Sequence, residues 1–126
     1  MSVNRAVAGL CLAVALFLVS ARASGGSTTT VKGYVLDSAC AFTKGLDKPI
    51  SAQCATACAK SGSPLVILTS DGTIYWPISD KTPATSQNDK LLPFAGQNVT
   101  ATGKLYERNG SRALVIEKLE ALPESK

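Results

Sequence analysis

The stretch "PLVILTSDGTIYWPIS", residues 64–79, carries the strongest local fold signal in this 126-residue chain. Two runs of β-branched and aromatic residues flank Asp71-Gly72, a dipeptide that favours a type I′ turn between antiparallel strands. The first run is apolar on both faces, which predicts a buried central strand. The second run alternates from Ile74 to Ile78, as expected of a strand with one buried face. The pattern therefore predicts a β-hairpin.

Three further runs have strand character. They are "TVKGYVLD" (30–37), "NVTATGKLYE" (98–107) and "SRALVIEKL" (111–119). Asn109-Gly110 supplies turn residues between the last two, so they form a second predicted hairpin. Gly33 and Gly103 interrupt their strands, and glycine inside a strand is typical of a bulge or a strong bend.

Two segments favour helix. In "ISAQCATACAKSG" (50–62), Ser51 is a candidate N-cap and Gly62 a candidate C-terminal stop, which predicts a helix over 51–60. Residues 41–49 are predicted to be a loop. After a polar loop over 80–90, "LLPFAG" predicts one helical turn closed by Gly96.

Five strands, with a short helix after the first and a helical turn before the fourth, predict a mainly β protein. Glycine-induced bending in two of the strands favours a small five-stranded OB-like barrel. An SH3-like barrel and a small sandwich are the alternative folds.

The N-terminal residues 1–23 have the organisation of a secretory signal peptide. A charged start precedes a fifteen-residue apolar run, and "ARA" offers a cleavage site after Ala23. The run is shorter than the roughly 20 apolar residues of a membrane-spanning helix, which disfavours an uncleaved anchor. We expect a secreted or periplasmic protein with no membrane segment after cleavage. It would comprise a flexible lead-in (24–30), one OB-like domain (31–122) and a tail (123–126).

Charge and composition limit the function classes. The chain has no histidine, which excludes imidazole-based triads and histidine general bases. Without Arg5 and Arg22 of the leader, eleven basic residues face nine acidic ones, so the charge is only +2. This near-neutral balance gives no strong case for nucleic acid or an anionic membrane as a partner. Tyr34, Tyr75, Trp76 and Tyr106 can form an aromatic face, but a core role for Trp76 is favoured.

Cys40, Cys54 and Cys58 remain after cleavage of the leader. Cβ atoms four residues apart on a helix lie about 5–6 Å from each other, whereas a disulfide needs about 3.5–4.5 Å. The pattern therefore predicts a disulfide between Cys40 and either Cys54 or Cys58, which leaves a free thiol or a disulfide-linked dimer. The alternatives are a trigonal Cu(I) or Zn site formed by all three thiolates, with Asp37 or water as a fourth ligand, and thiol-redox chemistry.

The order "GYVLDSAC", "CATACAKSGSPLVIL", "DGTIYWPI" and "AGQNVTATGKL" resembles small exported bacterial proteins of unknown function with an OB-like barrel. Their pattern is G-x-x-x-D-x-x-C, a helix ending in C-A-K-x-G, and a hairpin with a D-G turn. The resemblance covers residue 31 to about 119 and implies that Cys40, Cys54 and Cys58 belong together, which gives weight to metal or redox chemistry. It implies no activity. Some relatives have a histidine before the helix, and its absence here argues against a mixed His/Cys site.

The sequence therefore predicts a non-enzymatic OB-like binding module stapled by one disulfide, without identifying its ligand or partner. A thiolate carrier of Cu(I) or Zn, or a thiol-redox protein using Cys40, Cys54 and Cys58, is the alternative.

Overall fold

The structure is a computed structural model that describes residues 26–44 and 50–123. The predicted signal peptide, with its cleavage site after Ala23, lies outside the described residues. Among the described residues, no helix is both long enough and apolar enough to cross a membrane.

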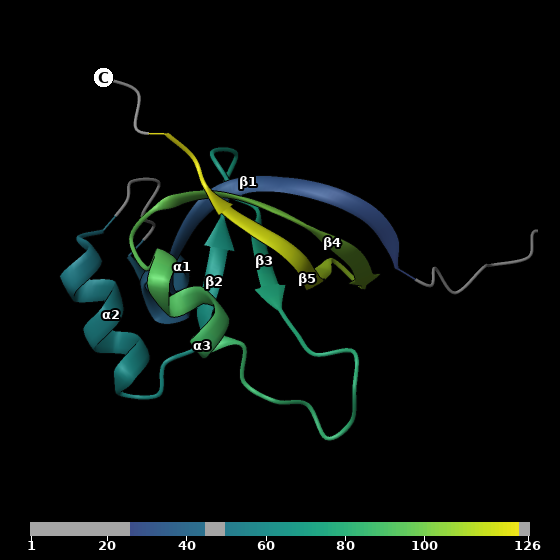
Figure 1. Cartoon of the computed structure of the whole chain (residues 1–126), viewed down its shortest axis with the longest axis horizontal. Coiled ribbons are helices and arrows are strands. Elements are labelled where there is room, and N and C mark those ends of the chain that lie inside the picture. The colour runs from purple at the N-terminus through teal and green to yellow at the C-terminus, as the bar shows by residue number, and fades with distance from the viewer. Residues whose placement is uncertain (1–25, 45–49, 124–126) are drawn as a thin grey trace, which may run out of the picture.

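The fold is a closed five-stranded barrel with short helices, and it confirms the predicted OB-like architecture. The strands follow the order β1-β2-β3-β5-β4, in which β3 and β5 are parallel and every other pair is antiparallel. In Figure 1, β1 arches over the β2–β3 hairpin and α2 lies beside one end of the barrel. The elements are β1 Ser27–Asp37, α1 Ser38–Thr43, α2 Ala52–Lys60, β2 Leu65–Leu68, β3 Ile74–Pro77, α3 Asn88–Leu91, the 3-10 helix η1 Leu92–Phe94, β4 Asn98–Arg108 and β5 Ser111–Ala121.

The first strand and the segment after it differ from the sequence prediction. β1 begins at Ser27, inside the predicted lead-in, because residues 27–30 pair with 102–105 of β4. The segment 41–43 is helical rather than a loop. The Asp37 side chain caps α1 by accepting a hydrogen bond from the Cys40 amide at 3.0 Å, which favours a helical turn directly after the strand.

Both interior glycines allow close backbone approach. At Gly103 the β4–β5 register shifts, so a bulge accompanies the bending expected of this strand. At Gly33 the β1–β4 register is unbroken. A Cβ atom on Gly33 would lie 2.5 Å from the Leu68 carbonyl oxygen, so a side chain there would push apart β1 and β2.

The two hairpin turns are of different kinds, and the prediction of a type I′ turn at Asp71-Gly72 is wrong. Asp71 does not have a positive φ, and Thr69 and Thr73 enclose a three-residue loop through a 3.0 Å backbone hydrogen bond. This is the geometry of a type I turn followed by a left-handed residue, Gly72. Asn109 and Gly110 both have positive φ, at 47° and 85°, as a type I′ turn requires.

Two apolar clusters lie on opposite sides of the sheet. β2 contributes to both, since Leu65 and Ile67 face the barrel interior while Val66 and Leu68 face outward. This confirms the prediction of a strand buried on both faces. The interior is filled by Val31, Val35, Ala59, Leu65, Ile67, Leu91, Val99, Ala101, Leu114 and Ile116. The outer cluster consists of Leu36, Cys40, Ala41, Val66 and Leu68, with Ile74 and Trp76 packed against it.

Asn88, the first residue of α3, joins three segments. Its Oδ1 accepts a hydrogen bond from the Leu65 amide at 2.9 Å, and its Nδ2 donates to the Ser63 carbonyl at 2.7 Å. Its Nδ2 also lies 3.5 Å from the Ala59 carbonyl at the end of α2. This side chain therefore fixes α2 and the start of β2 relative to α3.

Candidate functional site

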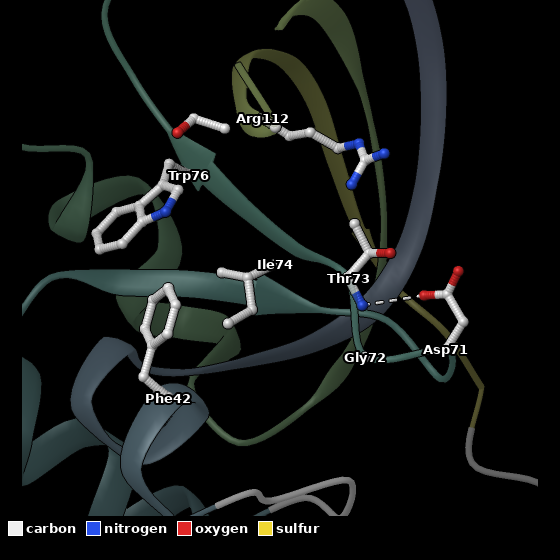
Figure 2. A pocket seen from close by; sticks show the side chains of 9 residues that line it. Phe42, Asp71, Gly72, Thr73, Ile74, Trp76 and Arg112 are labelled. Carbon is white, nitrogen blue, oxygen red and sulfur yellow. Dashed lines mark hydrogen bonds between the residues drawn. The ribbon is translucent and has the colours of Figure 1, made fainter. Parts of the chain in front are cut away.

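A cavity of about 410 Å³ lies where three connections of the barrel meet. Phe42 of α1 lines one side of it, the β2–β3 turn with the start of β3 lines a second, and residues 110–112 of the β4–β5 turn line a third. Figure 2 shows these side chains around the opening. The β2–β3 face and the loops beside it are where OB-folds hold their ligands. We call this cavity, lined by Phe42, Asp71, Thr73, Ile74, Trp76 and Arg112, the Trp76 groove.

One end of the groove is aromatic. The rings of Phe42 and Trp76 stack with centroids 6.0 Å apart and an interplanar angle of 30°. Phe42 is 61% exposed, and no other large hydrophobic side chain among the described residues is classed as exposed. The exposed ring of Phe42 and the half-buried ring of Trp76 together form the aromatic part of the groove lining.

The other end carries a fixed negative charge. The Thr69 hydroxyl donates a short hydrogen bond to Asp71 Oδ1, and the Thr73 amide donates another at 3.0 Å. The Thr69 side chain, followed by Thr73, lowers the pKa of Asp71 to about 2. Asp71 is therefore ionised throughout the neutral range and serves as a hydrogen-bond acceptor rather than as a proton donor.

Arg112 places a positive charge near the same end (Figure 2). Its Nε lies 2.9 Å from Glu107 Oε1, across the β4–β5 hairpin. This contact holds the side chain through one of its nitrogens. The two terminal nitrogens of the guanidinium group remain as donors for a ligand.

The three cysteines lie at α1 and α2 and are free thiols in this structure. Cys40 is buried in the outer cluster, Cys58 is half-buried and Cys54 is exposed. On α2, Ala55 and Ala59 face the core. Because Cys58 lies next to Ala59 and three residues after Ala55, it lies nearer the buried face of α2 than Cys54.

Burial, together with nearby charges, disfavours thiolate formation at Cys40 and Cys58. Burial raises the pKa of Cys40, and the negative charge of Asp37 raises it further. Burial and Asp37 raise the pKa of Cys58 in the same way, with Cys54 contributing. Lys44 opposes both shifts without reversing them. Cys58 also contributes to the raised pKa of Cys40, so the two thiols lie within electrostatic range of each other.

Asp37 is the buried charge at the centre of this neighbourhood, at 2% exposure. Burial works to raise its pKa, but the Ser63 side chain and the Cys40 amide favour the carboxylate more strongly, so the pKa of Asp37 is lowered. Oδ2 has no hydrogen-bond partner of normal geometry in the part of the chain that the structure describes.

The predicted thiolate metal site is not assembled in this structure. Within residues 26–44 and 50–123, no three His, Cys, Asp or Glu side chains are arranged to hold a metal ion. Cys40, Cys54 and Cys58 are brought to one region of the surface and its underlying core, but not to a common ligand position.

Phe42 and Arg112 were not among the binding residues predicted from the sequence. Phe42 fell within the predicted loop 41–49, although Asp37 just before it is a residue type that is preferred at helix N-caps. The four aromatic residues considered together do not share a face. Tyr75 packs against the barrel interior, whereas Tyr34 and Trp76 pack against the outer cluster.

Comparison with protein-family models, with curated proteins and with solved structures found no match to this chain.

Proposed function

We propose that this protein is a secreted or periplasmic binding module, and that the Trp76 groove is its ligand site. The observation that carries the proposal is the stacked pair of Phe42 and Trp76 at the mouth of a cavity of about 410 Å³. That volume lies within the range of about 300–1,000 Å³ that small-ligand sites have. A ligand in the groove would cover the exposed ring of Phe42.

The chemistry of the groove supports binding rather than catalysis. Its charged groups are Asp71, which remains ionised at neutral pH, and Arg112, which is held by Glu107. The pKa of Asp71, about 2, lies far from neutral pH, where a general acid or base works best. Both groups provide fixed charges that orient a ligand.

We further propose that Cys40 and Cys58 form the disulfide of the exported protein, and that Cys54 stays free. Cys58 is half-buried and acts on the pKa of Cys40, whereas Cys54 is exposed. The bridge would tie α1, which carries Phe42, to α2. Closing a loop of this length stabilises the fold by about 3 kcal/mol in the loop-entropy model.

The alternative roles, a Cu(I) or Zn carrier and a thiol-redox protein, are less well supported. Both need thiolates, because the thiolate is the metal ligand and the nucleophile. The raised pKa values of Cys40 and Cys58 favour the neutral thiols instead. A structural bridge needs no stable thiolate in the folded state.

Calorimetric titration with a panel of ligand classes tests the binding role. The panel contains neutral oligosaccharides, acidic oligosaccharides, peptides and oligonucleotides, each titrated into wild type and Phe42→Ala. We expect at least one class to bind, and Phe42→Ala to weaken that binding fivefold or more. Lys60→Ala, on the exposed side of α2, is the matched control and should bind as wild type does. Binding that Phe42→Ala leaves intact, or no binding by any class, would contradict the proposal.

A further inference from the structure

Trp76 also lines a second, separate cavity of about 330 Å³. This cavity lies between β3, the turn before β2 and the loop that leads to α3. Trp76 is the residue that lines both cavities. The second cavity is otherwise lined chiefly by Pro64, Pro77, Ile78, Thr85, Ser86 and Gln87. A ligand that fills both spaces must therefore pass over Trp76, so it is an extended chain.

The two linings share one chemistry. Each combines an apolar floor with neutral hydroxyl or amide groups, such as Thr73 and Ser111 in the Trp76 groove and Ser86 and Gln87 in the second cavity. Among the described residues, 26–44 and 50–123, only Asp71 and Arg112 are charged and line either cavity, and they have opposite signs. A polyanion such as nucleic acid needs several basic contacts along its backbone, and this surface offers one.

The closed barrel also disfavours a peptide that binds by strand addition. β3, which carries Trp76, pairs with β2 through Ile74 and Tyr75 and with β5 through Trp76 and Pro77, so neither of its edges is free along its whole length. Strand addition needs a free row of backbone amides and carbonyls at a sheet edge. Recognition at this surface must therefore rely on side chains.

We propose that the two cavities together bind an uncharged oligosaccharide that crosses Trp76, a proposal that rests on the binding function stated above. A pyranose ring has an apolar C–H face that packs against an aromatic ring and a rim of hydroxyls that need hydrogen-bond partners. Trp76 and Phe42 supply the aromatic surface. The neutral side chains of both linings, together with Asp71 and Arg112, supply donors and acceptors for the hydroxyls.

Calorimetric titration with cellohexaose and chitohexaose, and with glucose and N-acetylglucosamine, tests this inference. We expect at least one hexasaccharide to bind wild type at least tenfold more tightly than its single sugar. Trp76→Ala should weaken hexasaccharide binding at least tenfold, with circular dichroism reporting whether the fold is kept. Phe42→Ala provides a second variant that keeps the fold, because its side chain is already exposed. It should weaken binding in the same direction.

Filling the second cavity tests the length of the ligand. Ala84→Trp places a large side chain at an exposed position of that lining and should weaken hexasaccharide binding fivefold or more. Ala57→Trp, at an exposed position on α2, is the matched control and should have no effect. Equal affinities for hexasaccharide and single sugar, or full binding by Ala84→Trp, would overturn the extended ligand.

The remaining outcomes separate this inference from the proposed function. If a peptide or an oligonucleotide binds, Phe42→Ala weakens it and neither hexasaccharide binds, the oligosaccharide is wrong and the binding function stands. If no ligand of any class binds, both are wrong.

Discussion

Asp71 shows how single contacts decide the behaviour of a residue in this protein. The sequence marks it as a hairpin turn residue, and the structure confirms that location while changing the turn type. Its carboxylate accepts from Thr69 and Thr73, which hold the turn closed and hold the charge at the end of the Trp76 groove. One side chain therefore serves both the turn and the groove.

The pKa of Asp71 should be about 2 by NMR titration of its carboxyl carbon. Thr69→Val removes the strongest donor and should move the pKa towards the ordinary value of 3.8. Because the folded-state pKa is lowered, ionised Asp71 stabilises the protein above pH 4, and this stabilisation is lost as the pH falls through about 2. Thr28→Val, in β1 and away from the turn, is the control. An unchanged midpoint in Thr69→Val would show that the hydroxyl does not set the pKa.

Gly33→Ala should lower the free energy of unfolding by about 3 kcal/mol, as overpacking against backbone does. The new Cβ atom would lie 2.5 Å from the Leu68 carbonyl oxygen, which belongs to a paired strand and cannot move aside. Gly62→Ala is the comparison, because it adds only the strain of its positive φ in open space and should cost about 1 kcal/mol. Urea unfolding measures the free energy of unfolding of both variants. If the two variants lost the same free energy of unfolding, β1 and β2 would be able to move apart without cost, which would contradict this account of Gly33.

At the scale of elements, the helices are held to the barrel by a few specific contacts. α2 follows its sequence signals, with Ser51 capping its start through a 3.1 Å bond to the Cys54 amide. Its position on the barrel instead depends on Asn88, which lies 28 residues after the helix ends and has no marker in the sequence. α1 depends on Asp37 in the same way that α2 depends on Ser51. A side-chain cap at its own N-terminus stabilises each helix, whereas a residue distant in the sequence positions α2 on the barrel.

Asn88→Ala should destabilise the protein by about 2 kcal/mol, because it leaves the Leu65 amide and the Ser63 carbonyl without a partner. Gln87→Ala removes a side chain that donates only to the nearby Thr85 carbonyl and should cost less than about 0.5 kcal/mol. Thermal unfolding of both variants and of wild type gives the comparison. If both variants lost similar stability, Asn88 would not be the residue that joins α2 and β2 to α3.

The proposed Cys40–Cys58 disulfide should make α1 and α2 one covalent unit. Mass spectrometry of exported protein alkylated without reductant should find one labelled cysteine, Cys54, and two oxidised ones. Reduction or Cys58→Ser should each lower the free energy of unfolding by about 3 kcal/mol, whereas Cys54→Ser should leave it unchanged. Three alkylated cysteines, or a loss of stability confined to Cys54→Ser, would contradict this pairing.

At the scale of the whole molecule, the barrel was predictable and the groove was not. The hairpins, the bend at Gly103 and the helix over 51–60 all follow from short stretches of sequence, and together they restrict the fold to a small barrel. The Trp76 groove joins α1, the β2–β3 turn and the β4–β5 turn, which are far apart in the chain. Whether Phe42 is buried or exposed depends on which distant segments of the chain pack against α1. A local sequence pattern does not predict this tertiary packing.

The prediction of a type I′ turn at Asp71 is wrong for a related reason, because pairing between the strands overrides the local preference. The dipeptide alone favours that turn, but the backbone pairing of Thr69 with Thr73 sets a longer loop. Asn109-Gly110 keeps its local preference because Arg108 and Ser111 pair directly beside it.

Chemical-shift mapping of a bound ligand tests the central claim most directly. Trp76 is the only tryptophan in the chain, so its indole Nε1–H gives a single resonance at the site. With a ligand that binds in calorimetry, the account predicts that this resonance and the amides of residues 42, 71–76 and 110–112 move most. Movement confined to the exposed side of α2, at Ala52, Thr56 and Lys60, with the Trp76 indole unchanged, would contradict it.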